Sequence, residues 1–174
     1  KARAAASSLS SVIAQLGELT QAEAAPLQRG VERVALTQLA RETVDSLHGL
    51  LRERNVRATV GGPDAITDAD RGQLARALRN VVANAIQHSP ASAEVRIEVG
   101  DRPPSLRVTD TGPGIAAEDL PFIFERFYRA DRSRSRSGSG IGLTVARELI
   151  AANGGSISVE STGRDGTTFL IVFG

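Results

Sequence analysis

The 174-residue chain contains no cysteine, methionine or tryptophan, and only two histidines. Without cysteine, neither a disulfide framework nor a thiolate metal site can form, and two histidines argue against a zinc centre. No run of about 18 apolar residues is present, and the first residues lack the basic and then apolar pattern of a signal peptide. We therefore expect this piece of protein to be soluble and to be stabilised by packing alone.

The chain also lacks a large excess of positive or negative charge. The formal net charge is +1, so the chain as a whole offers no electrostatic footprint for nucleic acid, although arginines concentrate between residues 126 and 136. The hydrophobic fraction of 41% is ordinary for a globular domain. The absence of methionine indicates a fragment of a larger protein, and the length fits one domain with an appended element.

Hydrophobic spacing predicts the elements of the first half. Apolar residues at intervals of three to five predict a helix over residues 35–54, and alternation predicts a strand over 56–60. A second helix follows, capped by Thr67 or Asp68 and ending near Ser89 and Pro90. Residues 4–25 carry a narrow apolar stripe typical of a helix that packs on a partner, although a frayed tail would look the same.

The second half reads as two hairpins separated by a loop and a helix. Strands are predicted at residues 95–99 and 106–108, and again at 156–161 and 167–173, with a turn at 163–166 between the last two. A helix is expected at about 140–152. Hairpins mixed with helices favour an α+β fold, a two-layer sandwich of a mixed, mainly antiparallel sheet with about three helices on one face.

A polar stripe runs along the helix that ends near Ser89. Asn80, Asn84 and His88 recur at intervals of four, so they share one helix face. A solvated surface is the ordinary explanation. Two asparagines inside a helix are unfavourable for its stability, however, which indicates a need for neutral oxygen ligands. Mg²⁺ bound beside phosphates uses such oxygens.

Asp110 stands at the end of a predicted strand and is followed by Gly112, Gly114 and Ile115. An ordinary turn can have this sequence, but the glycines also allow the backbone to approach a ligand closely. A buried carboxylate can accept a hydrogen bond from the exocyclic amine of adenine. Guanine presents a carbonyl there, which would leave the acid unpaired at a cost of about 1–3 kcal/mol. The motif therefore favours adenine.

A second glycine loop precedes the last helix. The amides of Gly138, Gly140, Ile141, Gly142 and Leu143 could bind phosphate oxygens at a helix start, although a flexible linker ending in a helix has the same pattern. The loop is not a Walker A motif, because no lysine follows the glycines. The arginines before it fit either a mobile lid over the phosphates or a solvated basic loop.

In order and spacing, these pieces resemble the N, G1, F, G2 and G3 boxes of the histidine-kinase ATPase domain, from the superfamily shared with gyrase, Hsp90 and MutL. The matching segments are residues 80–85, 110–114, 122–129, 138–143 and 166–169. The resemblance covers residues 34 to 174 and implies the Bergerat ATP-binding fold. It divides the chain into a catalytic domain, residues 26–174, and a remnant of the second helix of a dimerisation domain, residues 1–25.

The resemblance also assigns roles. Asn84 would bind Mg²⁺ and Asp110 the adenine amine, with Gly114 and Thr167 helping through water. Arg126 and Arg129, with Asn84, form the catalytic set. The full nucleotide-binding set is Asn80, Asn84, Gln87, His88, Asp110, Gly112, Gly114, Ile115, Gly138, Gly140, Ile141, Gly142, Leu143 and Thr167. Two positions depart from the family: many members have Lys or Arg in place of Gln87, and Ser137 replaces the first glycine of G2.

As implied by the family, the complete protein would be a dimeric membrane sensor with this domain on the cytoplasmic side of a bacterial membrane. Its γ-phosphoryl transfer from Mg-ATP to a histidine of the dimerisation domain would feed a response-regulator aspartate, and the isolated fragment would be monomeric. The phosphoacceptor motif is missing, because Gly49 follows His48 and Ser89 follows His88. An ATP-sensing module without transfer remains an alternative because of Gln87. An anti-sigma serine kinase is disfavoured by the F box.

Overall fold

The computed structural model describes residues 30–129, 140–163 and 165–174. The predicted N-terminal helix remnant, the lid arginines from 132 to 136, and Gly138 lie outside these residues. In chain order the elements are β1 (Val31–Ala35), α2 (Leu36–Ser46), α3 (His48–Arg54), β2 (Arg57–Gly61), β3 (Ile66–Asp70), α4 (Arg71–His88), β4 (Glu94–Asp101), β5 (Pro104–Asp110), α5 (Gly142–Ala152), β6 (Gly155–Gly163) and β7 (Gly166–Phe173).

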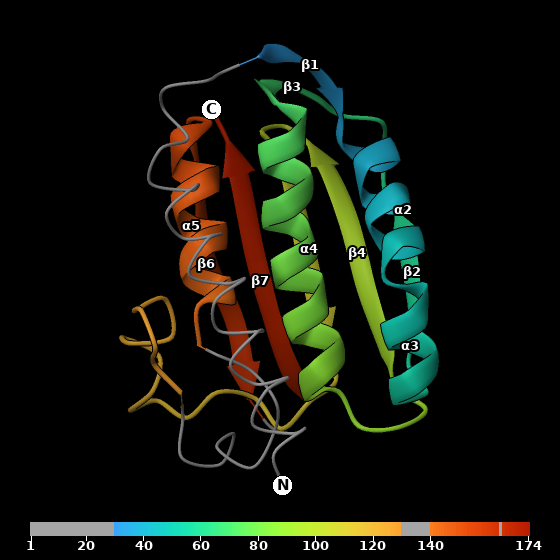
Figure 1. Cartoon of the computed structure of the whole chain (residues 1–174), viewed down its shortest axis with the longest axis vertical. Helices are drawn as coiled ribbons and strands as arrows, with labels where there is room; N and C mark the ends of the chain where they lie inside the picture. Colours follow the sequence, from blue (N-terminus) through green and yellow to red (C-terminus); the bar gives the residue numbers. More distant parts are fainter. Residues whose placement is uncertain (1–29, 130–139, 164) are drawn as a thin grey trace, which may run out of the picture.

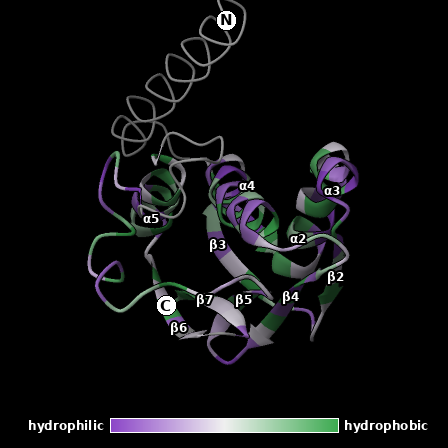
Figure 2. Cartoon of the chain, turned by 90° about the horizontal axis from the view of Figure 1, so that it is seen from below, coloured by the Kyte–Doolittle hydropathy of each residue, from purple (hydrophilic) through white to green (hydrophobic). Residues whose placement is uncertain are grey.

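The main sheet has five strands in the order β2-β4-β5-β7-β6. β2 runs parallel to β4, and the other three pairs are antiparallel. The helices α2, α3, α4 and α5 cover one face of this sheet (Figure 1), and their hydrophobic sides are turned toward it (Figure 2). The predicted α+β sandwich is thus confirmed, as are both predicted hairpins. No helix within the described residues is long and apolar enough to span a membrane.

The core lies between the sheet and the helices, as the period-two pattern requires. Leu106 and Val108 of β5 are 2% and 0% exposed, and alternate residues of β4 and β7 are buried in the same way. Side chains alternate between faces along a strand, so the next position of β5 on the helix-covered side is Asp110. β5 therefore supplies core side chains along its length and a carboxylate at its C-terminal end.

Two predicted boundaries are wrong. Residues 35–54 form two helices rather than one, with a break at Leu47. Before this break, the Thr43 hydroxyl donates to the Leu39 carbonyl at 2.8 Å and the Ser46 hydroxyl to the Thr43 carbonyl at 2.7 Å, and Gly49 follows it. Such side-chain bonds compete with helix continuation, and glycine is a poor helix former.

The predicted cap of α4 is also wrong. Thr67 and Asp68 lie within β3, which pairs antiparallel with β1, a strand that the hydrophobic spacing did not indicate. Asp70 is the actual cap, and its Oδ1 accepts a hydrogen bond from the Gln73 amide at 2.9 Å. Thr, Asp and Asn suit a cap by residue type alone, so only the long-range pairing of β1 with β3 decides which of them the helix uses.

Asn153, just after α5, joins α5 to α4 through hydrogen bonds. Its Oδ1 accepts from the Asp70 amide at 2.7 Å, and its Nδ2 donates to Gln73 Oε1 and the Leu149 carbonyl, both at 2.8 Å. A single side chain thus joins the end of α5 to the start of α4. This link fixes how the two helices lie along each other.

We expect Asn153→Ala to lower the free energy of unfolding by about 1–3 kcal/mol, because partly buried donors and acceptors lose their partner. Urea denaturation of the purified domain measures the change. Gln38→Ala is the matched control, since it removes an exposed amide hydrogen bond to Glu42 and should stay within about 0.5 kcal/mol of the wild type. An equal effect of the two substitutions would contradict the proposed link.

Candidate functional site

A buried carboxylate lies at the end of β5. Asp110 is only 3% exposed, and its Oδ1 accepts a hydrogen bond from the Gly112 amide at 2.7 Å. Asp110 is the register partner of Thr167 on β7, and Thr167 is in turn the partner of Thr162 on β6. Three polar residues thus form one row across three adjacent strands, where the sheet would otherwise continue with apolar side chains.

Burial raises the pKa of the Asp110 carboxyl above its ordinary value, and hydrogen bonds from the backbone of Gly112 and Thr167 lower it in part. Within the described part of the chain, no cationic side chain pairs with this carboxylate. A desolvated acid stabilised mainly by backbone amides is costly to the fold. Such a residue in a cleft is typical of a binding or catalytic group.

The glycines after Asp110 allow the chain to pass where a side chain would not fit. A Cβ at Gly112 would lie 2.8 Å from both Asp110 Oδ1 and the His88 carbonyl oxygen. Gly114 has a φ of +75°, and a Cβ there would come within 2.1 Å of the Gly163 carbonyl oxygen. The loop therefore packs closely between the end of α4 and the β6–β7 hairpin. Its glycines would also let the backbone come close to a ligand.

The polar stripe of α4 faces the start of α5. Asn80 lies against Gly142, because a Cβ at Gly142 would stand 4.0 Å from the Cβ of Asn80. The Nδ2 atom of Asn80 is buried and has no hydrogen-bond partner among the described residues. Buried amides are nearly always paired, so this one fits a site whose missing partner is a ligand oxygen.

The first turn of α5 begins without a side-chain cap. Its N-cap, Ile141, makes no side-chain capping bond, and Gly142 and Leu143 follow directly. The segment after the first glycine loop packs against this turn: the Phe127 amide donates to the Gly140 carbonyl at 3.1 Å, and the Thr144 hydroxyl donates to the Phe124 carbonyl at 3.0 Å. Free amides at a helix start are a ready anion site.

The predicted residues are brought together to different degrees. Arg129 reaches the second loop, with its Cγ 3.0 Å from where a Cβ of Gly140 would be. Asn84 lies on α4 one turn from both Asn80 and His88. Gln87 offers its backbone carbonyl to Arg54 Nη2 at 2.8 Å, and Arg126 is exposed. The described residues contain no group of three or more His, Asp or Glu that could hold a metal.

Thr162 is a site residue that sequence reasoning missed. Its Oγ1 accepts a hydrogen bond from the Ile115 amide at 2.7 Å and lies 3.2 Å from Thr167 Oγ1. No local pattern marks this threonine, which stands among Ser, Thr and Gly before a turn. Only the pairing of β6 with β7 brings it to the row that begins at Asp110.

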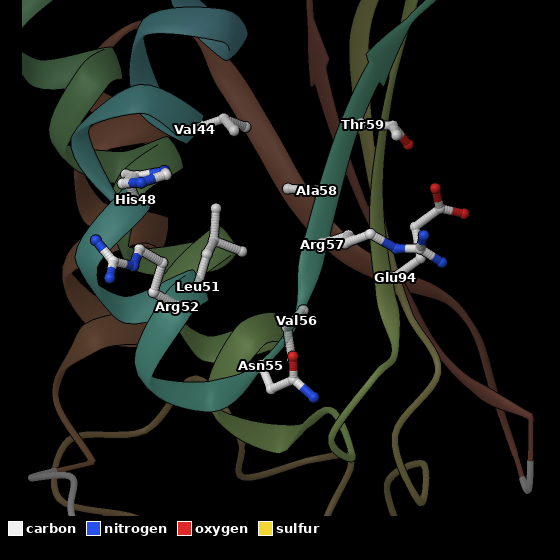
Figure 3. Close-up of a pocket in the computed structure, with 10 residues that line it drawn as sticks. All are labelled: Val44, His48, Leu51, Arg52, Asn55, Val56, Arg57, Ala58, Thr59 and Glu94. Atoms are coloured by element: carbon white, nitrogen blue, oxygen red, sulfur yellow. The ribbon is translucent and has the colours of Figure 1, made fainter.

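A separate groove of about 610 Å³ lies at the other edge of the sheet, between α2–α3 and β2 (Figure 3). Its lining residues are Val44, His48, Leu51, Arg52, Asn55, Val56, Arg57, Ala58, Thr59 and Glu94. None of them belongs to the predicted site, whose described residues lie on α4, β5, β7, the start of α5 and the loops between them. The candidate site and this groove therefore do not coincide.

Comparison with known proteins relates this geometry to a family. The family model of histidine kinase-, DNA gyrase B- and HSP90-like ATPases matches residues 69–174, which is more than half of the chain. The match contains the whole of α4, both glycine loops and the strands β4 to β7. All residues predicted for the nucleotide fall inside it.

Individual relatives agree. The signal transduction histidine-protein kinase ArlS of Staphylococcus aureus is 31% identical over 166 residues, which are 93% of this chain but only 37% of ArlS. The mycobacterial sensor histidine kinase MprB has a TM-score of 0.71 at 28% identity over 82% of this chain and 96% of that one. Full-length ShkA in complex with AMPPNP has a TM-score of 0.81 at 26% identity, over 94% and 35% of the two chains. The chain belongs to the histidine kinase-, DNA gyrase B- and HSP90-like ATPase family, as a catalytic ATP-binding domain of the sensor histidine kinase type.

Proposed function

We propose that this chain binds Mg-ATP and transfers its γ-phosphoryl group to a histidine on a dimerisation domain, from which a response-regulator aspartate receives it. The observation that carries the proposal is the buried Asp110 carboxylate, which is stabilised by backbone amides and lies among glycines with no room for side chains. Buried acids with a perturbed pKa are concentrated at functional sites. The family to which the chain belongs supports the same reading.

Asp110 is the group that would select the base. The carboxylate accepts hydrogen bonds from the backbone of Gly112 and Thr167, and its two oxygens together retain the capacity to accept from a further donor. The exocyclic amine of adenine is such a donor, whereas guanine offers a carbonyl oxygen that the carboxylate would repel. Gly112, Gly114, Ile115, His88 and Thr167 would form the walls around the base.

The phosphates would lie between α4 and α5. The amides of Gly140, Ile141, Gly142 and Leu143 and the unpaired Asn80 Nδ2 are donors for phosphate oxygens, and Arg126 and Arg129 would supply positive charge. Magnesium, when bound, would neutralise charge between the phosphates, and Asn84 would hold it through its amide oxygen. Phosphoryl transfer needs chiefly such positioning and charge stabilisation.

The family to which the chain belongs supports a proposal for the organisation of the complete protein. The chain spans about 37% of the length of ArlS, so further segments are expected in the complete protein. We propose that residues 1–25 belong to the second dimerisation helix and 26–174 to the catalytic domain. The full-length protein would be a membrane-anchored homodimer with this domain on the cytoplasmic side of a bacterial membrane, and the isolated fragment a monomer.

A second candidate is an ATP-sensing module that binds nucleotide without transferring phosphate. Gln87 favours it, because this position contributes a cation in many members of the family, and here a neutral side chain stands at the end of α4. The lost charge would weaken the stabilisation of the transferring phosphoryl group more than the binding of ATP. The two candidates differ in phosphate transfer only.

Transfer is tested by mixing the chain with Mg-ATP labelled at the γ-phosphate and a matching dimerisation fragment that carries the acceptor histidine. We expect label on that histidine and none on the chain itself, since neither His48 nor His88 is followed by an acidic residue. Label on the chain's own histidines would contradict the proposal. ATP binding without any label on the acceptor would favour the sensing module.

Asp110→Asn and Asn84→Ala should distinguish the contribution of the adenine base to ATP affinity from the contribution that depends on Mg²⁺. Asp110→Asn is expected to weaken ATP binding at least tenfold with or without Mg²⁺, because Gly112 retains the oxygen and the new amide meets the adenine amine as a second donor. Asn84→Ala should remove only the part of the affinity that depends on Mg²⁺. Calorimetric titrations of both variants, with Asp101→Asn as an exposed control, measure this. Unchanged titrations in both would overturn the pocket.

The affinity for ATP should depend on pH through Asp110. Burial raises the pKa of the free carboxyl, and a bound amine donor favours its ionised form. The affinity for ATP is therefore at its maximum above this raised pKa and decreases as the pH falls through it. The decrease begins above the ordinary aspartate pKa of about 4. Titrations between pH 4 and 8 measure the profile, which Asp101→Asn should leave unchanged. A profile that is flat down to pH 4 would contradict the assignment.

A further inference from the structure

The pairing of β6 with β7 contains a register shift next to the site. Val159 pairs with Phe169, but the next pairs are Ser161 with Thr168 and Thr162 with Thr167, so Glu160 is the extra residue of a β-bulge. With regular pairing, Ser161 would be the partner of Thr167. The bulge instead brings Thr162 into the row that begins at Asp110.

The extra residue of the bulge forms an ion pair that crosses β7. Arg107 of β5 donates from Nε to Glu160 Oε2 at 2.8 Å and from Nη2 to Oε1 at 3.0 Å. Because β7 lies between β5 and β6, this bidentate contact spans the middle strand on the face that the helices do not cover. The bulge and the ion pair therefore occur at the same residue.

The hydroxyl of Thr162 has two hydrogen-bonding tasks. Its oxygen accepts from the Ile115 amide at 2.7 Å, directly after the glycine loop, and its proton needs an acceptor. Thr167 Oγ1 lies 3.2 Å from Thr162 Oγ1, and either hydroxyl can donate to the other. When Thr162 donates, the proton of the Thr167 hydroxyl is available to a third group beside Asp110.

We propose that Thr162 is a positioning and specificity-determining residue of the nucleotide site: it holds the Asp110 glycine loop against the β6–β7 hairpin and sets the Thr167 hydroxyl as a donor beside the Asp110 acceptor. This rests on the proposed function, in which the row binds a base. An acceptor next to a donor matches adenine, whose amine lies beside a ring nitrogen that accepts. Guanine has a carbonyl beside an N–H, which is the opposite pattern.

Thr162→Val keeps the shape of the side chain and removes the hydroxyl. We expect ATP affinity to fall about tenfold, because the Ile115 amide loses its acceptor, and the preference for ATP over GTP to shrink at least threefold. Thr162→Ser should restore both quantities. Thr109→Val is the matched control, since it removes a similar contact with Thr168 Oγ1 at 3.1 Å one row away and should change neither.

Nucleotide titrations with ATP and GTP, together with the melting temperature of each variant, decide the outcome. A wild-type chain that binds no adenine nucleotide would refute the proposed function itself. A folded Thr162→Val variant with wild-type affinity and selectivity would overturn the role of Thr162 and leave the function standing. If that variant does not fold, hydrogen exchange in the wild type decides: the Ile115 amide should be protected before nucleotide is added, and rapid exchange would overturn the proposal.

Discussion

Burial of the Asp110 carboxylate is the constraint on which the rest of the site depends. A charged oxygen at 3% exposure needs donors close by, and the chain supplies them from its own backbone rather than from a cation. Backbone amides can reach the carboxylate only if the residues around it lack side chains, which accounts for Gly112. A carboxylate without a counter-ion keeps its capacity to accept from a ligand. Burial without a counter-ion therefore makes Asp110 costly to the stability of the fold, and it would also let the carboxylate accept a hydrogen bond from a ligand.

The one-sided sandwich makes this arrangement possible. All four described helices cover one face of the sheet, so the row of core positions on β5 continues from Leu106 and Val108 to Asp110 without a change of direction. The same face carries α4 and α5, whose packing brings Asn80 against the start of α5. Asn153 ties these helices at their other ends. One layer therefore positions both the acid and the first turn of α5.

Much of this was predictable because it depends on neighbours in the sequence. Alternation gave the hairpins of β4–β5 and β6–β7, and the glycine spacing together with Asp110 and Asn84 indicated the family, which the comparisons confirm. The two failures have different causes. Residue type predicts a cap at Thr67, yet Thr67 belongs to a two-stranded sheet whose other strand begins at Val31, far away in the sequence. The break at Leu47 is accompanied by local side-chain bonds of Thr43 and Ser46, which the hydrophobic spacing does not reveal.

By itself, the sequence determined the candidate residues for the proposed site: a carboxylate at a strand end, glycines that let the backbone approach, asparagines on a helix face, and a helix start without a side-chain cap. Only the tertiary structure decided which of them meet. The partner of Thr167 is Thr162 rather than Ser161 because of a bulge at Glu160, whose carboxylate pairs with Arg107, 53 residues away in sequence. Register is set by contacts between strands, and a shift of one residue exchanges the side chain that faces the site. No local pattern in the chain contains that information.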